Sequence, residues 1–181
     1  MAQIDVIVVD SRDRPVGKME KLEAHIKGQL HRAITVYVFN AQQQLLLQRR
    51  ARDKYHCGGL WSNTTCGHPY PGESTLGAAQ RRLAEEMGLQ PALTPVFELS
   101  YHLTMSNGLI EHEYGHVFFA QTDALPKVNP QEADAWRYAS VDEIATEMAL
   151  SPACFTPWFL HTFESIPAQA AAFFTAAVQR G

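Results

Sequence analysis

The chain has 181 residues, of which 46% are hydrophobic, and it carries a formal net charge of −4. This length and apolar content suit one compact core, so we expect a single domain over residues 1–181. The mixed charges offer no basic face for a nucleic-acid backbone, which argues against nucleic-acid binding. The N-terminus lacks a signal-peptide pattern, and no apolar run approaches the roughly eighteen residues of a membrane helix, so a cytoplasmic protein is expected.

The first part of the chain predicts strands. IDVIVVD, residues 4–10, is apolar and β-branched, and HRAITVYVFN and QLLLQRRA, residues 31–40 and 44–51, have the same character. The last two are separated only by the short polar connection around NAQQ, residues 40–43. They are therefore predicted to form a hairpin.

A helix is predicted to follow, with Ser74 or Thr75 as its N-cap and Gly88 at its C-terminus. Its core positions are expected at helical spacing: Leu76, Ala79, Leu83 and Met87. Arg82 and Glu86 then lie one turn apart on or near the opposite side. Taken alone, an exposed ion pair explains them.

The remaining elements complete the expected fold. A strand, LIEHEYGHVFFAQT at residues 109–122, follows the turn signal Ser106-Asn107-Gly108. Ser140 and Glu143 have capping-box spacing and predict another helix. The part of the chain after residue 153 has mostly helical composition. Because strands and helices interleave without a regular βαβ repeat, the pattern predicts an α+β or mixed α/β sandwich.

The loop and helix after residue 66 carry a specific spacing of glycines, charges and apolar residues. The positions involved are Gly67, Glu73, Arg81, Leu83, Glu85, Glu86, Gly88 and Leu89. Together they resemble the Nudix box, a loop and helix whose carboxylates hold magnesium against a diphosphate. The pattern departs from the box at Arg82, where Nudix hydrolases usually have a glutamate. Loss of a carboxylate should weaken metal-assisted hydrolysis, whereas an arginine can bind a diphosphate that stays intact.

Further chemistry-bearing side chains lie elsewhere in the sequence. Glu111 and Glu113 alternate within a predicted strand, so both face one side of it while His112 faces the other. Cys66 and His68 are likewise two residues apart. His25 and His31 flank the start of a strand, and imidazoles with carboxylates suit a divalent ion such as zinc or manganese. The other histidines are expected on the surface or in ordinary hydrogen bonds: His56, His102, His112, His116 and His161.

The three cysteines have no disulfide-framework or zinc-ribbon spacing, so each is considered as a thiol. Cys57 and Cys154 are expected to be small buried apolar residues. Cys66 alone lies in a motif with other polar groups.

These residues together resemble the type I isopentenyl diphosphate isomerase family, Nudix relatives that move a double bond in a five-carbon diphosphate. The resemblance runs from about Lys21 to Trp158 and is carried by WSNTTCGHP, RRLAEEMG, IEHEYGHVF and FTPW. It implies an α/β/α sandwich with mixed sheets, in which an N-terminal segment of about residues 1–30 covers the site. The implied substrate is a small isoprenoid diphosphate. The resemblance implies nothing about oligomeric state.

The resemblance also implies roles for individual residues. Cys66 and Glu113 would be the catalytic pair on opposite faces of the substrate, with Tyr101 near the catalytic acid and Trp158 over the reacting carbons. The diphosphate would be bound by Lys21, Arg50, Lys54 and Arg82. One divalent metal, manganese, zinc or magnesium, would be held by His25, His31, His68, Glu111 and Glu113. Glu86 would help to hold a magnesium ion that arrives with the diphosphate.

The implied chemistry explains why a thiol would stand at position 66. Moving an unactivated double bond requires protonating one carbon, passing through a tertiary carbocation and removing a different proton. Nearby cations are expected to favour the Cys66 thiolate. Two alternatives remain open at this point: a Nudix hydrolase of a nucleoside diphosphate derivative, and a catalytically silent diphosphate-binding module.

Overall fold

The computed structural model describes residues 4–54 and 56–179. Its strands, in chain order, are β1 (Asp5–Val9), β2 (Pro15–Glu20), β3 (His31–Phe39), β4 (Leu45–Arg50), β5 (Trp61–Ser62), β6 (Thr65–Gly67), β7 (Thr94–Thr104), β8 (Ile110–Gln121) and β9 (Ala133–Ala139). Its helices are α1 (Lys21–Lys27), α2 (Thr75–Met87), α3 (Val141–Leu150), a short 3₁₀ turn (Pro152–Cys154), α4 (Pro157–Phe163) and α5 (Ile166–Val178). No helix in this part of the chain is long and apolar enough to span a membrane.

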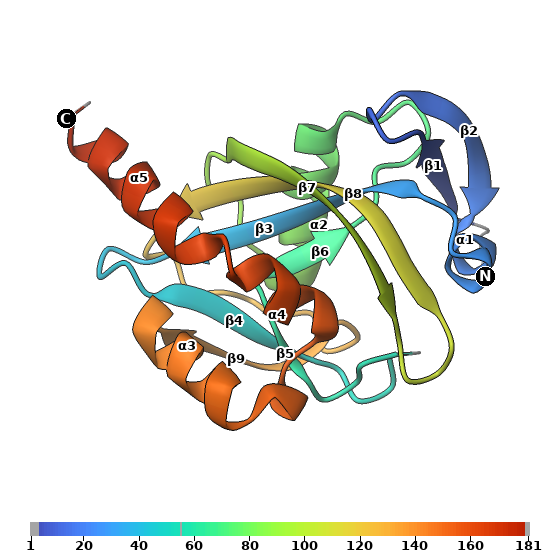
Figure 1. Ribbon diagram of the computed structural model, residues 1–181. Helices are drawn as coiled ribbons and strands as arrows, with labels where there is room; N and C mark the ends of the chain where they lie inside the picture. The colour runs from blue at the N-terminus through green and yellow to red at the C-terminus, as the bar shows by residue number, and fades with distance from the viewer. Residues whose placement is uncertain (1–3, 55, 180–181) are drawn as a thin grey trace.

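The sheet is mixed and is organised around β3. β3 pairs in parallel with β8 along its whole length and antiparallel with β6. β4 pairs antiparallel with β9 and β5, and β7 forms a long antiparallel hairpin with β8. Figure 1 shows β3, β7 and β8 crossing the middle of the molecule, with β1, β2 and α1 at the N-terminal side.

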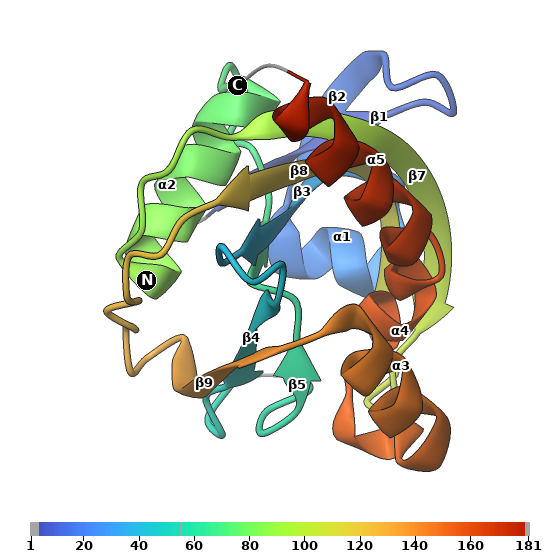
Figure 2. The same ribbon diagram turned by 90° about the vertical axis from the view of Figure 1, so that its left-hand side faces the viewer.

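β3 is buried on both faces because an apolar layer covers each side of the sheet. Tyr37 and Phe39 belong to the cluster that includes α3, α4 and α5, whereas Val36 and Val38 pack with α2. Alternate residues of a strand point to opposite faces, so this division follows directly from the β3 sequence. Figure 2 shows α2 on one side of the strands and α3, α4 and α5 on the other. The predicted helix–sheet–helix sandwich is confirmed.

The predicted hairpin between residues 31 and 51 is only partly correct. Both strands form, but β3 and β4 pair at a single position, Phe39 with Leu45, and then diverge. Each strand has a longer partner elsewhere, β8 for β3 and β9 for β4. Those pairings are long-range, and a local sequence pattern does not indicate them.

The ends of α2 agree with the prediction, but its buried face is rotated from the predicted one. Ser74 caps the helix by accepting a hydrogen bond from the Gly77 amide at 3.0 Å, and Gly88 ends it in the left-handed conformation at φ 65°. Leu76, expected in the core, is 40% exposed, whereas Glu86, expected near the opposite side, is buried. The buried face therefore centres near Ala79 and Glu86 rather than near Leu83, which brings Glu86 under the sheet.

Other local predictions are confirmed. The turn after β7 closes through Met105 and Leu109, with Gly108 at φ +83°. The capping box at Ser140 and Glu143 is present in both directions. The strands β2, β5, β6, β7 and β9 and the helix α1 were not predicted, because they are short or lack clear apolar periodicity.

Candidate active site

A cavity of about 430 Å³ opens beside β6, between α1, α2, β8 and α4. Its walls include Lys21, His25, Arg50, Lys54, His56, Cys66, His68, Arg82, Glu86, Tyr101, Glu111, Glu113, Glu132 and Trp158. With one exception, every site residue expected from the sequence lines this cavity. The exception is His31, which is fully buried behind the cavity wall.

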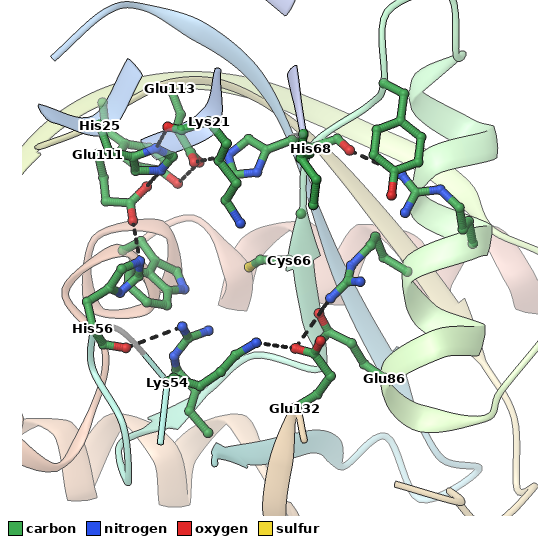
Figure 3. Close-up of a pocket in the computed structure, with 18 residues that line it drawn as sticks. Lys21, His25, Lys54, His56, Cys66, His68, Glu86, Glu111, Glu113 and Glu132 are labelled. Atoms are coloured by element: carbon green, nitrogen blue, oxygen red, sulfur yellow. Dashed lines mark hydrogen bonds and ion pairs between the residues drawn. The ribbon is translucent and has the colours of Figure 1, made fainter. Parts of the chain in front are cut away.

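Three histidines and one carboxylate converge at one end of the cavity. His25, His31, His68 and Glu113 each place one donor atom within 4.8 Å of the others. His68 Nε2 lies 3.2 Å from His31 Nε2 and 2.8 Å from Glu113 Oε1. Figure 3 shows His25, His68 and Glu113 above Cys66, at the opposite end of the cavity from Glu86 and Glu132.

The orientation of these imidazoles suits a metal ion. Nδ1 of His25 is held by the Lys21 carbonyl at 2.6 Å, and Nδ1 of His31 by the Gln29 carbonyl at 2.7 Å. When Nδ1 donates to a carbonyl, Nε2 keeps its lone pair for a ligand. His25 Nε2 is also buried without a hydrogen-bond partner among the described atoms. The donor set therefore fits a divalent ion that accepts imidazole nitrogen and carboxylate oxygen.

Glu111 lies next to this group rather than within it. Glu111 and Glu113 share one face of β8, as the sequence alternation predicted, and both line the cavity. One Glu111 oxygen lies 3.3 Å from His25 Nε2, and the other lies 3.1 Å from His56 Nε2. The structure thus brings four of the five expected ligands into one cluster and places the fifth at its edge.

Glu113 lies between two neighbouring strands of the sheet. It is opposite His31 in the β3–β8 ladder and opposite Tyr101 in the β7–β8 ladder. Burial alone would raise the pKa of Glu113, but the adjacent imidazoles of His31 and His68 hold that pKa well below its usual range. Burial and the neighbouring Glu113 carboxylate raise the pKa of Tyr101 far above its usual range. These shifts favour an ionised Glu113 carboxylate and a neutral Tyr101 phenol that donates a hydrogen bond to it.

Cys66 lies in the middle of the cavity, on β6 opposite Thr35 of β3. Its thiol donates to Asn63 Oδ1 at 3.2 Å. Burial raises the pKa of Cys66 to about 12, and the carboxylates of Glu113 and Glu86 add to this effect. The expectation that nearby cations lower the pKa of this thiol was therefore wrong, because burial has the largest effect and the charges that shift the pKa are carboxylates. These effects favour the thiol form of Cys66.

The four expected diphosphate-binding cations are spread along the cavity. Lys54 and Arg82 lie at the other end beside Glu132, Arg50 lies against Trp158, and Lys21 extends from the histidine side (Figure 3). Arg82 contacts Glu85 at 2.7 Å, forms an ion pair with Glu86 and lies 3.4 Å from Glu132. Lys54 also pairs with Glu132. Burial and the Arg82 charge lower the pKa of Lys21. This end therefore combines cations with carboxylates that an incoming anion or metal–anion complex would rearrange.

Glu86 reaches this end from the buried face of α2. Gln48 Nε2 donates to its carboxylate at 2.7 Å, and the Thr65 hydroxyl donates to the same oxygen. Arg82 pairs with its other oxygen. The exposed ion pair that α2 alone suggested is thus a partly buried one.

A close approach between β6 and α2 sets the position of Arg82. A Cβ atom at Gly67 would lie only 2.8 Å from Arg82 Cγ, so a larger residue there would displace the side chain. The preceding residue, Arg81, binds Glu73 through two contacts of 2.8 Å, covers the Tyr70 ring and donates to the His68 carbonyl at 3.2 Å. Arg81 and Glu73 of the box therefore support the loop that carries His68.

Trp158 contributes an aromatic wall. Its indole N–H donates to Ser62 Oγ at 3.1 Å, and the Arg50 guanidinium lies 5.1 Å from its ring centre. Trp158 is buried, yet it lines the cavity. It is thus both part of the core and part of the site.

Sequence reasoning missed His56 and Glu132 of the cavity wall and misjudged one cysteine. His56 was expected to have an ordinary role, and Glu132 was not considered; both come from loops that carry no periodic signal. Cys154 is exposed at the 3₁₀ turn, so its predicted burial was wrong, and Cys57 is half-buried. The expectation holds for His112, which bonds the Gly28 carbonyl, and for His116, which bonds Asp13.

Comparison with known proteins identifies the class to which this fold and cavity belong. Residues 29–159 match the family model described as NUDIX domain. A solved structure of DR0079 from Deinococcus radiodurans has a TM-score of 0.75 at 17% identity and covers 88% of this chain and 97% of its own. A MutT protein structure from Methanosarcina mazei has a TM-score of 0.64 at 19% identity, covering 77% and 94%. At these identities the two structures support the fold alone.

Curated relatives with high sequence identity show to which family within this class the chain belongs. A protein of Pectobacterium atrosepticum named isopentenyl-diphosphate Delta-isomerase is 60% identical over 92% of this chain and 93% of its own length. Isopentenyl-diphosphate Delta-isomerase 2 of Aromatoleum aromaticum is 47% identical over 84% of this chain and 81% of its length. The chain therefore belongs to the isopentenyl-diphosphate Delta-isomerase family of NUDIX proteins, and the resemblance seen in the sequence is confirmed.

Proposed function

We propose that this protein interconverts isopentenyl diphosphate and dimethylallyl diphosphate. The observation that carries the proposal is the placement of the Cys66 thiol and the Glu113 carboxylate on the walls of one cavity, where the pKa of the thiol is raised and that of the carboxylate is lowered. An isomerisation by proton transfer needs one group that holds a proton and another that can accept one. The names of the curated relatives support the same reaction.

The diphosphate binds at the cationic end of the cavity. Lys21, Arg50, Lys54 and Arg82 supply charges and hydrogen-bond donors for its oxygens, and the guanidinium groups can each hold two oxygens. Magnesium bound to the diphosphate would reduce its charge, and Glu86, which lines the cavity, would help to hold that ion. Binding the diphosphate here leaves the five-carbon chain near Cys66.

The proton transfers then take place between two walls. Protonation of one alkene carbon produces a tertiary carbocation, and removal of a proton from a neighbouring carbon produces the isomer. Cys66 and Glu113 perform these two steps from opposite sides of the substrate, while Tyr101 donates a hydrogen bond to Glu113 and steadies its charge. The electron-rich face of Trp158 stabilises the cation by about 2 kcal/mol, or somewhat more than tenfold in rate.

Water must be kept from the carbocation, because it would trap the cation as an alcohol. The N-terminal segment is the cover in this proposal. Ile4, Lys21 and His25 from this segment line the cavity. The same N-terminal segment thus covers the cavity and carries His25, one of the proposed metal ligands.

One divalent ion, manganese, zinc or magnesium, would be held by His25, His31, His68 and Glu113, with Glu111 beside them. A bound ion would fix Glu113 and balance the charge of the two adjacent carboxylates. Elemental analysis of the purified protein should find about one such ion per chain. His25→Ala should abolish this content, and a metal content that does not depend on His25 would contradict the assigned site.

The reaction is tested by incubating the protein with isopentenyl diphosphate and magnesium in D₂O. Proton NMR should show dimethylallyl diphosphate with deuterium incorporated, and phosphorus NMR should show an intact diphosphate. Release of phosphate would instead support the hydrolase, which the otherwise complete box with Glu85 and Glu86 favours. Thermal stabilisation by the substrate without any product would support a silent binding module.

A further inference from the structure

His56 contacts three different parts of the site. It stands in the loop between β4 and β5, lines the cavity and is 9% exposed. Its Nε2 lies 3.1 Å from Glu111 Oε1, and its ring meets Trp158 edge-on, with centroids 5.4 Å apart and an interplanar angle of 85°. Its carbonyl accepts a hydrogen bond from Arg50 Nη2 at 3.3 Å.

The two oxygens of Glu111 contact different histidines. Oε1 faces His56, whereas Oε2 lies 3.3 Å from Nε2 of His25, one of the four converging donors. A carboxylate held through one oxygen by an imidazole N–H presents its other oxygen in a fixed direction. Here that direction is toward the His25 end of the cluster (Figure 3).

The contact with Trp158 links His56 to the aromatic wall of the cavity. An edge-to-face arrangement places the positive edge of one ring against the negative face of the other, which favours a defined orientation. Arg50 lies over the same indole at 5.1 Å and is itself bonded to the His56 carbonyl. The loop residue therefore connects the metal cluster, the aromatic wall and one diphosphate-binding cation.

We infer that His56 is a positioning residue that holds Glu111 so that its second oxygen completes the metal site, while its ring fixes the orientation of Trp158. This inference rests on the metal site and the activity put forward above. Loss of a hydrogen bond to a ligand carboxylate typically weakens metal binding by about tenfold to a hundredfold.

The first test measures metal binding without catalysis. The protein is stripped with a chelator, and its affinity for Mn²⁺ and Zn²⁺ is measured by competition with a chromophoric chelator. His56→Ala should weaken binding by about tenfold to a hundredfold. His56→Gln, whose amide N–H can replace Nε2–H, should recover much of the loss. His102→Ala, an exposed histidine on β7 outside the cavity wall, is the matched control and should bind as the wild type does.

A double variant tests whether His56 acts through Glu111. If it does, Glu111→Gln with His56→Ala should bind metal no more weakly than Glu111→Gln alone. Independent, additive losses would overturn the proposed route, as would wild-type affinity in a folded His56→Ala protein. Should His56→Ala not fold, His56→Phe takes its place, because it keeps a ring against Trp158 but lacks the N–H that faces Glu111. Wild-type metal affinity in His56→Phe would overturn the inference.

Turnover provides a separate readout. At saturating metal, His56→Ala should lower kcat more than it changes KM for isopentenyl diphosphate, because Trp158 faces the reacting carbons rather than the diphosphate. If His56→Ala weakens metal binding but the wild type forms no dimethylallyl diphosphate, the proposed activity fails while the positioning of Glu111 stands. If the wild type binds no divalent ion, the inference about His56 is overturned.

Discussion

Tyr101 lies directly opposite Glu113 in the β7–β8 ladder, and its phenol donates a hydrogen bond to the Glu113 carboxylate. Both side chains are buried and both line the cavity. A hydrogen bond to a charged group contributes about 1.5–3 kcal/mol, so Tyr101→Phe should lower kcat by roughly tenfold to 150-fold. KM should change little, because Tyr101 is not among the diphosphate-binding cations. Steady-state kinetics with isopentenyl diphosphate measure both values, and an unchanged kcat would exclude a role for the phenol in the reaction.

Cys66 and Glu113 are predicted to be indispensable. Cys66→Ala and Glu113→Gln should each remove nearly all isomerisation, because each deletes one of the two groups that hold or accept a proton. Circular dichroism should show that both variants are folded. Cys154→Ala is the matched control, since this exposed cysteine lies outside the cavity wall, and it should keep full activity. Turnover near the wild-type rate in either site variant would falsify the assigned roles.

The reactivity of Cys66 should depend on pH over an unusually wide range. Burial raises the pKa of this thiol to about 12, so the reactive thiolate is scarce at neutral pH and increases about tenfold per pH unit up to that value. In metal-free protein, iodoacetamide should therefore modify exposed Cys154 well before Cys66 at pH 8. Peptide mass spectrometry follows each site. A rate for Cys66 that levels off near pH 8 would contradict the raised pKa.

Arg82 is predicted to be needed for stability as well as for binding. Arg82→Met removes the charge partner of Glu86, which is 5% exposed, and should cost about 3 kcal/mol of unfolding free energy. Adding Glu86→Gln should recover most of this loss, because no buried charge is then left unpaired.

Urea unfolding measures these free energies, with Arg14→Met as the control. Arg14 pairs with Asp10 at the surface, its side chain is 70% exposed, and such pairs contribute about 1 kcal/mol or less. A loss in Arg82→Met no larger than in Arg14→Met would show that the Arg82–Glu86 pair contributes little to stability.

The local features of the site could be predicted from the sequence. The caps of α2 at Ser74 and Gly88 depend on residues a few positions apart, and so does the alternation that places Glu111 and Glu113 on one face of β8. The spacing of the box likewise lies within one loop and one helix. These features depend on residues close together in the chain, so the residue types and their spacing are enough to predict them.

The exact direction in which a helix faces the core was harder to predict. Leu76 and Glu86 exchanged their expected environments because the buried face of α2 depends on which strands it meets. A polar residue on that face is tolerated since Gln48 and Thr65 supply donors from the sheet. No pattern within the helix indicates those partners.

By itself the sequence determined the class of fold, the family and the residue types available for chemistry, because these depend on local periodicity and on motif spacing. Only the tertiary structure decided how the metal cluster is assembled. The parallel pairing of β3 with β8 places His31 opposite Glu113. His25 joins this cluster from α1. It also decided that His56, from a loop without periodicity, stands against Glu111 and Trp158. Contacts between residues far apart in the chain arise from strand pairing and packing, and their free energies are not expressed in any short stretch of sequence.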